Sequence, residues 1–156
     1  MSVNRGKDFE NAIKESFEKV PNTNVVRLLD PQRGYAGVRN ICDFVVYHYP
    51  HQYLIECKSV YGNTLPFSNI TKNQWDGLTN ANCFGVRSGY MVWFIDHDIT
   101  LFVTARLLDS LKQDGYKSLN VKDVEKLSRD TNLYVIKGTK KRIMFEYDMK
   151  DFFENF

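Results

Sequence analysis

The chain has 156 residues and a formal net charge of +2, which fit one folded domain with one core. Hydrophobic residues make up 43% of it and include eleven Phe and nine Tyr, which excludes a disordered protein. No apolar run approaches the roughly 18 residues of a membrane-spanning helix, and residues 1–14 lack the apolar centre of a signal peptide. We therefore expect a single domain over residues 1–156, located in the cytoplasm and not bound to a membrane.

The first predicted element is a helix over residues 6–20, in which apolar residues recur at three- and four-residue spacing until Pro21 ends it. A short apolar strand is predicted over residues 24–29. Residues 30–40 are rich in Gly and Arg and contain one Pro, which predicts a loop or a short projecting arm.

Two β-rich runs follow, over residues 41–49 and 52–60, and the turn between them predicts a hairpin. Residues 62–69 are predicted to form a loop. A helix is predicted over residues 71–82, because Thr71 and Gln74 have the spacing of a capping box.

The second half of the chain alternates between predicted strands and helices. They are a hairpin of residues 90–95 and 99–103, a helix over 104–114 stopped by Gly115, a helix over 121–129, strands over 133–137 and 142–147 around Gly138, and a helix over 149–156. This order predicts an α/β fold with one central mixed β-sheet flanked by helices.

The two strands of the first hairpin carry charged residues in otherwise apolar runs. Asp43 lies in the first strand, and a carboxylate there is costly to bury without a partner. Glu56 and Lys58 lie in the second strand, two residues apart, and therefore project from one face. If the turn centre falls between Tyr49 and Pro50, Asp43 lies opposite Glu56 with Cβ atoms about 5 Å apart. A register slipped by one residue would place the two carboxylates on opposite faces.

Two adjacent carboxylates repel by roughly 4 kcal/mol at about 4 Å and an effective dielectric near 20, so something must compensate them. Oxygen ligands beside one lysine suit Mg²⁺ or Mn²⁺, which would bind a phosphate oxygen and lower the pKa of a bound water. Lys58 would hold that water or stabilise the charge that grows on the phosphoryl group. The alternative is a structural ion cluster of Asp43, Glu56 and Lys58 on a half-exposed sheet.

Two further residues offer oxygen atoms to the same site. Glu10 borders the apolar stripe of the first helix, and Gln74 lies in the first turn of the helix that follows Lys58. The alternatives are a solvated helix charge for Glu10 and a purely capping role for Gln74.

Basic residues gather in two places on this nearly neutral chain. Arg27, Arg33 and Arg39 bracket a segment that contains a single acidic residue, and residues 137–142 carry three Lys and one Arg. Such local patches can contact phosphates, although ordinary solvated loop charge is the alternative for each.

Asp43 followed by Glu56-Cys57-Lys58 resembles the Asp…Glu-x-Lys signature of the PD-(D/E)XK nuclease superfamily. Residues 4–10, which read Asn-Arg-Gly-Lys-Asp-Phe-Glu, resemble the opening of the RecU-type Holliday-junction resolvases within it. The Pro- and Phe-containing loop over residues 63–67 and the subsequent Gln74 resemble the stretch that follows the lysine in that family.

The resemblance covers most of residues 4–105 and implies a restriction-endonuclease-like fold. It also implies a homodimer that nicks four-way DNA junctions with Mg²⁺ or Mn²⁺. The compact size of this chain would suit a phage-encoded member of the family. Metal ligation would fall to Asp43, Glu56 and Gln74 and a catalytic role to Lys58, with Glu10 as an auxiliary residue.

For DNA, the resemblance makes residues 30–40 a short counterpart of the stalk that enters the junction, with Tyr35 available to stack on a base. The expected backbone contacts are Arg27, Arg33, Arg39 and Lys72. This chain has Ile41 where the family often carries a Thr near the metal, so that side-chain ligand is lost. A recombinase is a further candidate partner. The alternative functions are a related restriction or repair nuclease and a non-catalytic DNA- or recombinase-binding module.

Overall fold

The computed structural model describes residues 4–29, 39–142 and 144–156, and a six-stranded sheet forms its centre. The strands, in their order across the sheet, are β1 (Thr23–Arg27), β2 (Phe44–His48), β3 (His51–Val60), β5 (Arg87–Phe94), β6 (Ile99–Thr104) and β8 (Leu133–Val135). β3 and β5 pair in parallel, whereas the other neighbours are antiparallel. The predicted mixed sheet is therefore confirmed.

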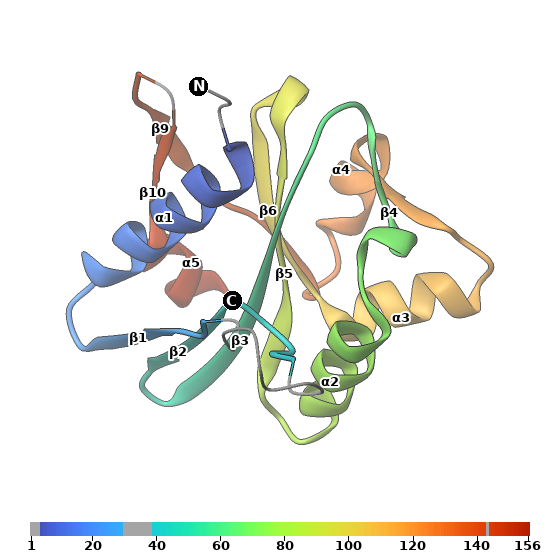
Figure 1. The fold of residues 1–156 in the computed structure, drawn as a ribbon, viewed down its shortest axis with the longest axis horizontal. Coiled ribbons are helices and arrows are strands. Elements are labelled where there is room, and N and C mark those ends of the chain that lie inside the picture. Colours follow the sequence, from blue (N-terminus) through green and yellow to red (C-terminus); the bar gives the residue numbers. More distant parts are fainter. Residues whose placement is uncertain (1–3, 30–38, 143) are drawn as a thin grey trace.

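Helices cover both faces of this sheet (Figure 1). One face carries α1 (Arg5–Glu18) and α5 (Met149–Asn155), and the other carries α2 (Lys72–Cys83), α3 (Ala105–Gln113) and α4 (Val124–Leu127). In the parts of the chain that the structure describes, no helix has the length and apolar character needed to cross a lipid bilayer.

The helix ends follow from their sequences. The Asn4 side chain accepts a hydrogen bond from the Lys7 backbone N–H at the start of α1, as an N-cap does. Thr104 caps α3 in the same way, and Gly115, at φ +93°, follows its end as predicted. The helix predicted over residues 121–129 is shorter, because a 3-10 turn (Val121–Asp123) precedes the four-residue α4.

Two small sheets accompany the central one, which corrects the expectation of one sheet. β4 (Thr64–Pro66), in the predicted loop 62–69, pairs with β7 (Ser118–Asn120). The late strands are shorter than the predicted strands 133–137 and 142–147 and include a further one: β8 joins the central sheet, while β9 (Gly138–Lys140) pairs with β10 (Phe145–Tyr147).

The first hairpin has the predicted register. Its pairs run from Phe44 opposite Ile55 to His48 opposite His51, so the turn consists of Tyr49 and Pro50. The paired register ends at Phe44, because β2 begins only there; Asp43, one residue before it, lies beside residues 55–57 of β3, where its N–H donates to the Ile55 carbonyl and its carboxylate accepts from the Cys57 N–H. Strand alternation then directs successive β3 side chains to the two helical layers.

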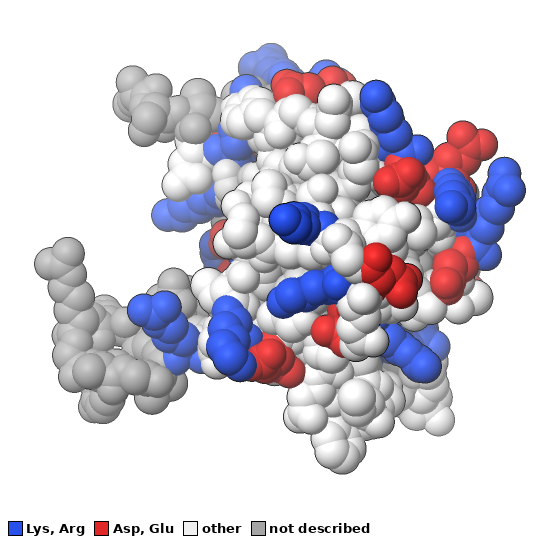
Figure 2. Space-filling model, turned by 90° about the vertical axis from the view of Figure 1, so that its right-hand side faces the viewer, with Lys and Arg blue, Asp and Glu red and all other residues white. Residues whose placement is uncertain are grey.

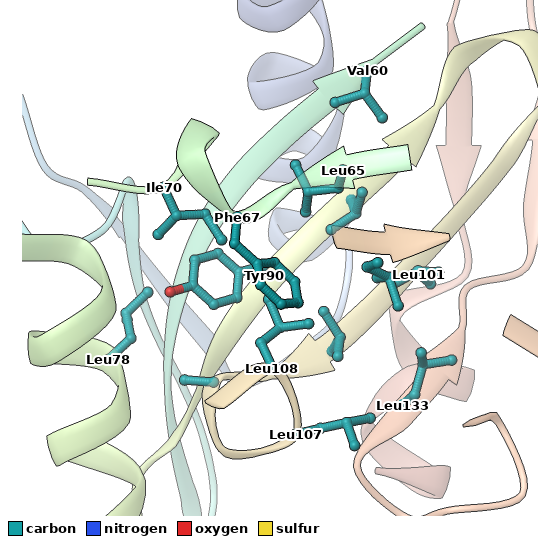
Figure 3. Close-up of a cluster of buried hydrophobic side chains, with 14 of the residues drawn as sticks. Val60, Leu65, Phe67, Ile70, Leu78, Tyr90, Leu101, Leu107, Leu108 and Leu133 are labelled. Carbon is teal, nitrogen blue, oxygen red and sulfur yellow. The ribbon is translucent and has the colours of Figure 1, made fainter. Parts of the chain in front are cut away.

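The layer on the α2 face has an apolar core around Tyr90 of β5 (Figure 3). The fully buried side chains around it include Leu65 from β4, Leu78 from α2, Leu101 from β6 and Leu108 from α3. Burying each such side chain contributes about 1.5–3 kcal/mol, which fixes α2 against β3 and β5.

Candidate active site

A polar cavity of about 400 Å³ opens where α1, β1, β3 and α2 meet. It forms because β2 begins only at Phe44, so β3 has no neighbour on that side beyond Ile55. Its lining combines charged and amide side chains with a few apolar ones: Lys7, Glu10, Arg27, Leu28, Leu29, Asn40, Cys42, Asp43, Glu56 and Gln74.

Asp43 lies just before β2 and is held by both neighbouring strands. Its backbone N–H donates to the Ile55 carbonyl at 3.0 Å, and its carbonyl accepts from the Leu28 N–H at 2.8 Å. Its carboxylate accepts a hydrogen bond from the Cys57 N–H at 2.8 Å, in the place where a strand partner is missing. Burial raises the pKa of Asp43, while the Cys57 N–H and a hydrogen bond with Glu56 partly oppose that shift.

Glu56 is buried on the α2 face, with a side chain only 7% exposed. One carboxylate oxygen, Oε1, accepts a hydrogen bond from Gln74 Nε2 at 2.7 Å and lies 3.0 Å from Lys58 Nζ. Burial and the nearby charge of Asp43 raise the pKa of Glu56 to about 7, although Lys58 acts in the opposite direction. A bound cation would therefore stabilise the ionised forms of both carboxylates.

Gln74 caps α2 and also contacts two residues of the candidate site. With Thr71 it forms a complete capping box at the start of α2, in which its Oε1 accepts from the Thr71 N–H at 3.2 Å. The same oxygen accepts from Lys58 Nζ at 3.3 Å, while the amide nitrogen faces Glu56. Metal ligation by this oxygen would require the amide to turn away from Thr71, so the structure favours a role in orienting Glu56 and Lys58.

Glu10 and Arg27 form an ion pair across α1 and β1 and both line the cavity. Arg27 also donates to Asn11 Oδ1 at 2.9 Å and lies over the Phe44 ring at 5.8 Å from its centroid. Glu10 is therefore not simply a solvated helix charge, and Arg27, an expected DNA contact, is engaged within the protein.

The predicted arm can be followed only at its base. Asn40 donates to the Leu29 carbonyl at 2.8 Å, and Asn73 of α2 donates to the Arg39 carbonyl at 3.1 Å, so both ends meet beside the cavity. The Arg39 side chain is exposed. Most of the arm, including Arg33 and Tyr35, lies outside the described residues.

Lys72, another expected DNA contact, is 89% exposed and forms an ion pair with Asp76 one turn further along α2. The three lysines of the second basic patch are also paired. Lys137 contacts Asp151, Lys140 contacts Asp98 and Lys141 contacts Glu146. These ion pairs favour the interpretation of the second basic patch as solvated surface charge.

The sequence interpretation did not identify Gly77 as part of the site's framework. A Cβ atom at Gly77 would lie 2.5 Å from Cγ2 of Ile41, so the absence of a side chain there lets residues 39–42 pack closely on α2. Ile41 therefore has a packing role. An isolated Gly inside a predicted helix is the signal that could have revealed this close approach.

The donor set fits a divalent cation that is bound by few protein ligands. Within residues 4–29, 39–142 and 144–156, no three His, Cys, Asp or Glu side chains group together as a metal site. Mg²⁺ commonly needs only one or two carboxylates, with water and substrate phosphate completing its shell. Asp43 and Glu56, with their raised pKa values and shared cavity, meet that requirement.

Comparisons with known proteins give little further information. No family model and no curated protein matches the sequence. Among solved structures, 17 chains match. One is Hjc of Archaeoglobus fulgidus, a Holliday junction resolvase from an archaeal hyperthermophile, with 20% identity over 65% of this chain and 78% of that chain. Its TM-score of 0.49 is too low for the likeness to support an argument about the site.

Proposed function

We propose that the protein is a divalent-metal-dependent endonuclease that hydrolyses phosphodiester bonds in branched DNA, with the four-way junction as its substrate. The proposal is carried by one observation, the cavity in which the Asp43 and Glu56 carboxylates lie beside the Lys58 ammonium group. A purely structural ion cluster would have no need of an open cavity of about 400 Å³ at the carboxylates.

Asp43 and Glu56 would hold Mg²⁺ or Mn²⁺, and the bound ion would supply Lewis-acid activation of the phosphate and of a water molecule. The Cys57 N–H fixes the Asp43 carboxylate, and Gln74 fixes that of Glu56, so both ligands are oriented before substrate arrives. Lys58 holds the attacking water or donates a hydrogen bond to a phosphate oxygen as negative charge develops there.

Substrate binding would involve the residues expected to contact DNA. Arg39 and Lys72 are exposed and would contact the DNA backbone, together with Arg33, whereas Arg27 would first have to exchange its partner Glu10. Tyr35 would stack on a base at the branch. A homodimer would present two such cavities to the two strands that are cut, and a recombinase would be a further partner.

The main test is cleavage of a labelled four-way junction by the Asp43→Asn and Glu56→Gln variants. Both are expected to lose more than about 100-fold in rate, because the loss of a ligand exceeds the 10–100-fold loss on removing its support. Junction binding, measured by fluorescence anisotropy, should persist in both. Glu154→Gln, an exposed carboxylate on α5, is the matched control and should cleave normally. Cleavage retained by Glu56→Gln would overturn the proposal.

The role of Lys58 and the substrate can be tested in the same assay. Lys58→Ala should slow turnover by more than it weakens binding, whereas a pure loss of affinity would indicate a DNA-contact role. The wild-type protein should cut four-way junctions in preference to linear duplexes. Equal cutting of linear duplex DNA would indicate a restriction-type or repair nuclease. No metal-dependent cutting of any DNA would indicate a non-catalytic binding module.

A further inference from the structure

A second cavity, of about 960 Å³, lies beside α2 and α3. We call it the α2–α3 groove; its lining residues are Phe67, Ser68, Ile70, Lys72, Trp75, Asp76, Lys112, Gly115, Tyr116 and Lys117. Helical geometry places residues 72 and 76 on the side of α2 opposite Gln74, which faces the candidate active site. The two cavities are therefore separated by the first turns of a single helix.

The floor of the groove is aromatic and rigid. The rings of Phe67 and Trp75 lie 5.3 Å apart, and Trp75 Nε1 donates to Asp109 Oδ1 at 2.9 Å, which fixes the indole. Tyr116 stands at the edge, 52% exposed, and follows the glycine that ends α3. Its ring is an accessible aromatic surface next to a buried apolar floor.

The rim of the groove is positively charged. It carries Lys72, Lys112 and Lys117 against a single carboxylate, Asp76, which is paired with Lys72. Lys112 Nζ lies 4.4 Å from the centroid of the Trp75 ring, so an ammonium group is held over the floor. Figure 2, which views the side that carries α3 and α4, shows a largely uncharged surface on which Lys and Arg side chains alternate with Asp and Glu.

We propose that the α2–α3 groove binds an unpaired DNA strand that continues from the candidate active site over the first turns of α2. An exposed aromatic ring beside a basic rim suits a single strand, in which a base stacks on the ring and the phosphates contact lysines. A helix is about 10–12 Å wide, a distance that three or four stacked nucleotides cover at about 3.4 Å each. Lys72 lies on that path and meets the groove at its rim.

This inference rests on the proposed function, and it narrows the proposed substrate from branched DNA in general to one kind of branch. The enzyme would act on branches with unpaired nucleotides beside the scissile bond, one base being stacked on Tyr116. An acidic peptide with an apolar anchor is the competing occupant. It is less favoured because only the first turns of α2 separate the groove from the cavity lined by the Asp43 and Glu56 carboxylates.

The test is binding of a short single-stranded oligonucleotide that contains 2-aminopurine, measured in EDTA so that no cleavage is involved. Tyr116→Ala should weaken binding at least 5-fold, since one base stack is worth at least about that factor. It should also remove the quenching of 2-aminopurine. Tyr116→Phe keeps the ring and should bind normally. Unchanged affinity and quenching in Tyr116→Ala would overturn the proposal.

The lysine contribution is tested by the salt dependence of the same binding. Lys117→Gln should reduce the slope of log affinity against log salt by about 0.7, and Lys150→Gln, an exposed lysine on α5, should leave it unchanged. A glutamate-rich peptide containing one Trp serves as the second probe. If Tyr116→Ala abolishes binding of this peptide but not of the oligonucleotide, the groove is a protein-docking site. Because EDTA excludes cleavage, these results are independent of whether Asp43→Asn abolishes activity.

Discussion

The two faces of the central sheet carry different kinds of core. On the α1 face, aromatic rings from α1, β3, β6 and β8 pack around Phe152 of α5. On the α2 face, the apolar cluster gives way to Glu56, Lys58 and Gln74. β3 supplies both faces, because Ile55 points to one layer while Glu56 points to the other. A single strand thus contributes an apolar side chain to the core on one face and a buried carboxylate on the other.

The largest expected effect tests the stabilising role of the α1 face. Phe152→Ala should lower the free energy of unfolding by about 3–5 kcal/mol, because it removes a fully buried ring from the centre of the cluster. Urea unfolding measures this loss, and junction cleavage per folded molecule should be unchanged. Phe84→Ala is the control, since Phe84 is 80% exposed and its loss should change stability by less than about 0.5 kcal/mol. Lower cleavage by fully folded Phe152→Ala would show that the two faces are not separable.

The next effect concerns the cost of buried charge on the α2 face. The pKa of Glu56 is about 7 in the folded protein against an ordinary value of 4.5, so the folded state binds more protons than the unfolded state between these values. Stability should therefore fall as pH rises from about 4.5 to about 7, by on the order of 2 kcal/mol. Burial of Glu56 is the main cause of this change, the charge of Asp43 adds to it, and Lys58 opposes it.

Urea unfolding at pH 5 to 8 in EDTA measures this pH dependence. Glu56→Gln should lose most of the decline, whereas Glu154→Gln should keep it. Mg²⁺ should restore stability at pH 8, since an ion that binds only the folded state stabilises it by mass action. If the stability of the wild type falls no more with pH than that of Glu56→Gln, burial of the ionised Glu56 does not destabilise the protein as predicted.

The parts of the site that follow from local sequence could be predicted. The register of the first hairpin depends on strand alternation and on the two turn residues Tyr49 and Pro50. The close approach of Asp43 to Glu56 could therefore be predicted from the sequence. The capping box of α2 spans four residues and was equally accessible from Thr71 and Gln74.

The parts that depend on distant residues could not be predicted. The ion pair of Glu10 with Arg27 joins two elements whose packing is set by the whole sheet. β4 and β7 are three-residue strands far apart in the sequence, too short for periodicity to reveal them. The orientation of the Gln74 amide depends on Lys58 and Glu56 together. The sequence could therefore indicate which residues form the site, but their hydrogen-bond and ion-pair partners depend on the tertiary structure.

The smallest expected effect compares one tyrosine hydroxyl from each face. The Tyr90 hydroxyl on the α2 face is buried and has no hydrogen-bond partner among the described residues, and Figure 3 shows it directed towards Ile70 and Leu78. The Tyr147 hydroxyl on the α1 face lies 2.9 Å from Thr100 Oγ1. Tyr147→Phe should therefore lower the free energy of unfolding by about 1 kcal/mol, whereas Tyr90→Phe should raise it by up to about 1 kcal/mol.

Urea unfolding of both variants, with the wild type as reference, gives the two changes in stability. Opposite signs would mean that the α2 face carries an unsatisfied polar group in addition to its buried carboxylate. Burial and the charge of Glu56 both raise the pKa of Tyr90, so the hydroxyl stays protonated and retains a donor beside the acidic site. An equal loss in both variants would mean that the Tyr90 hydroxyl is hydrogen-bonded in solution. The polar network of the candidate active site would then extend into the core beneath α2.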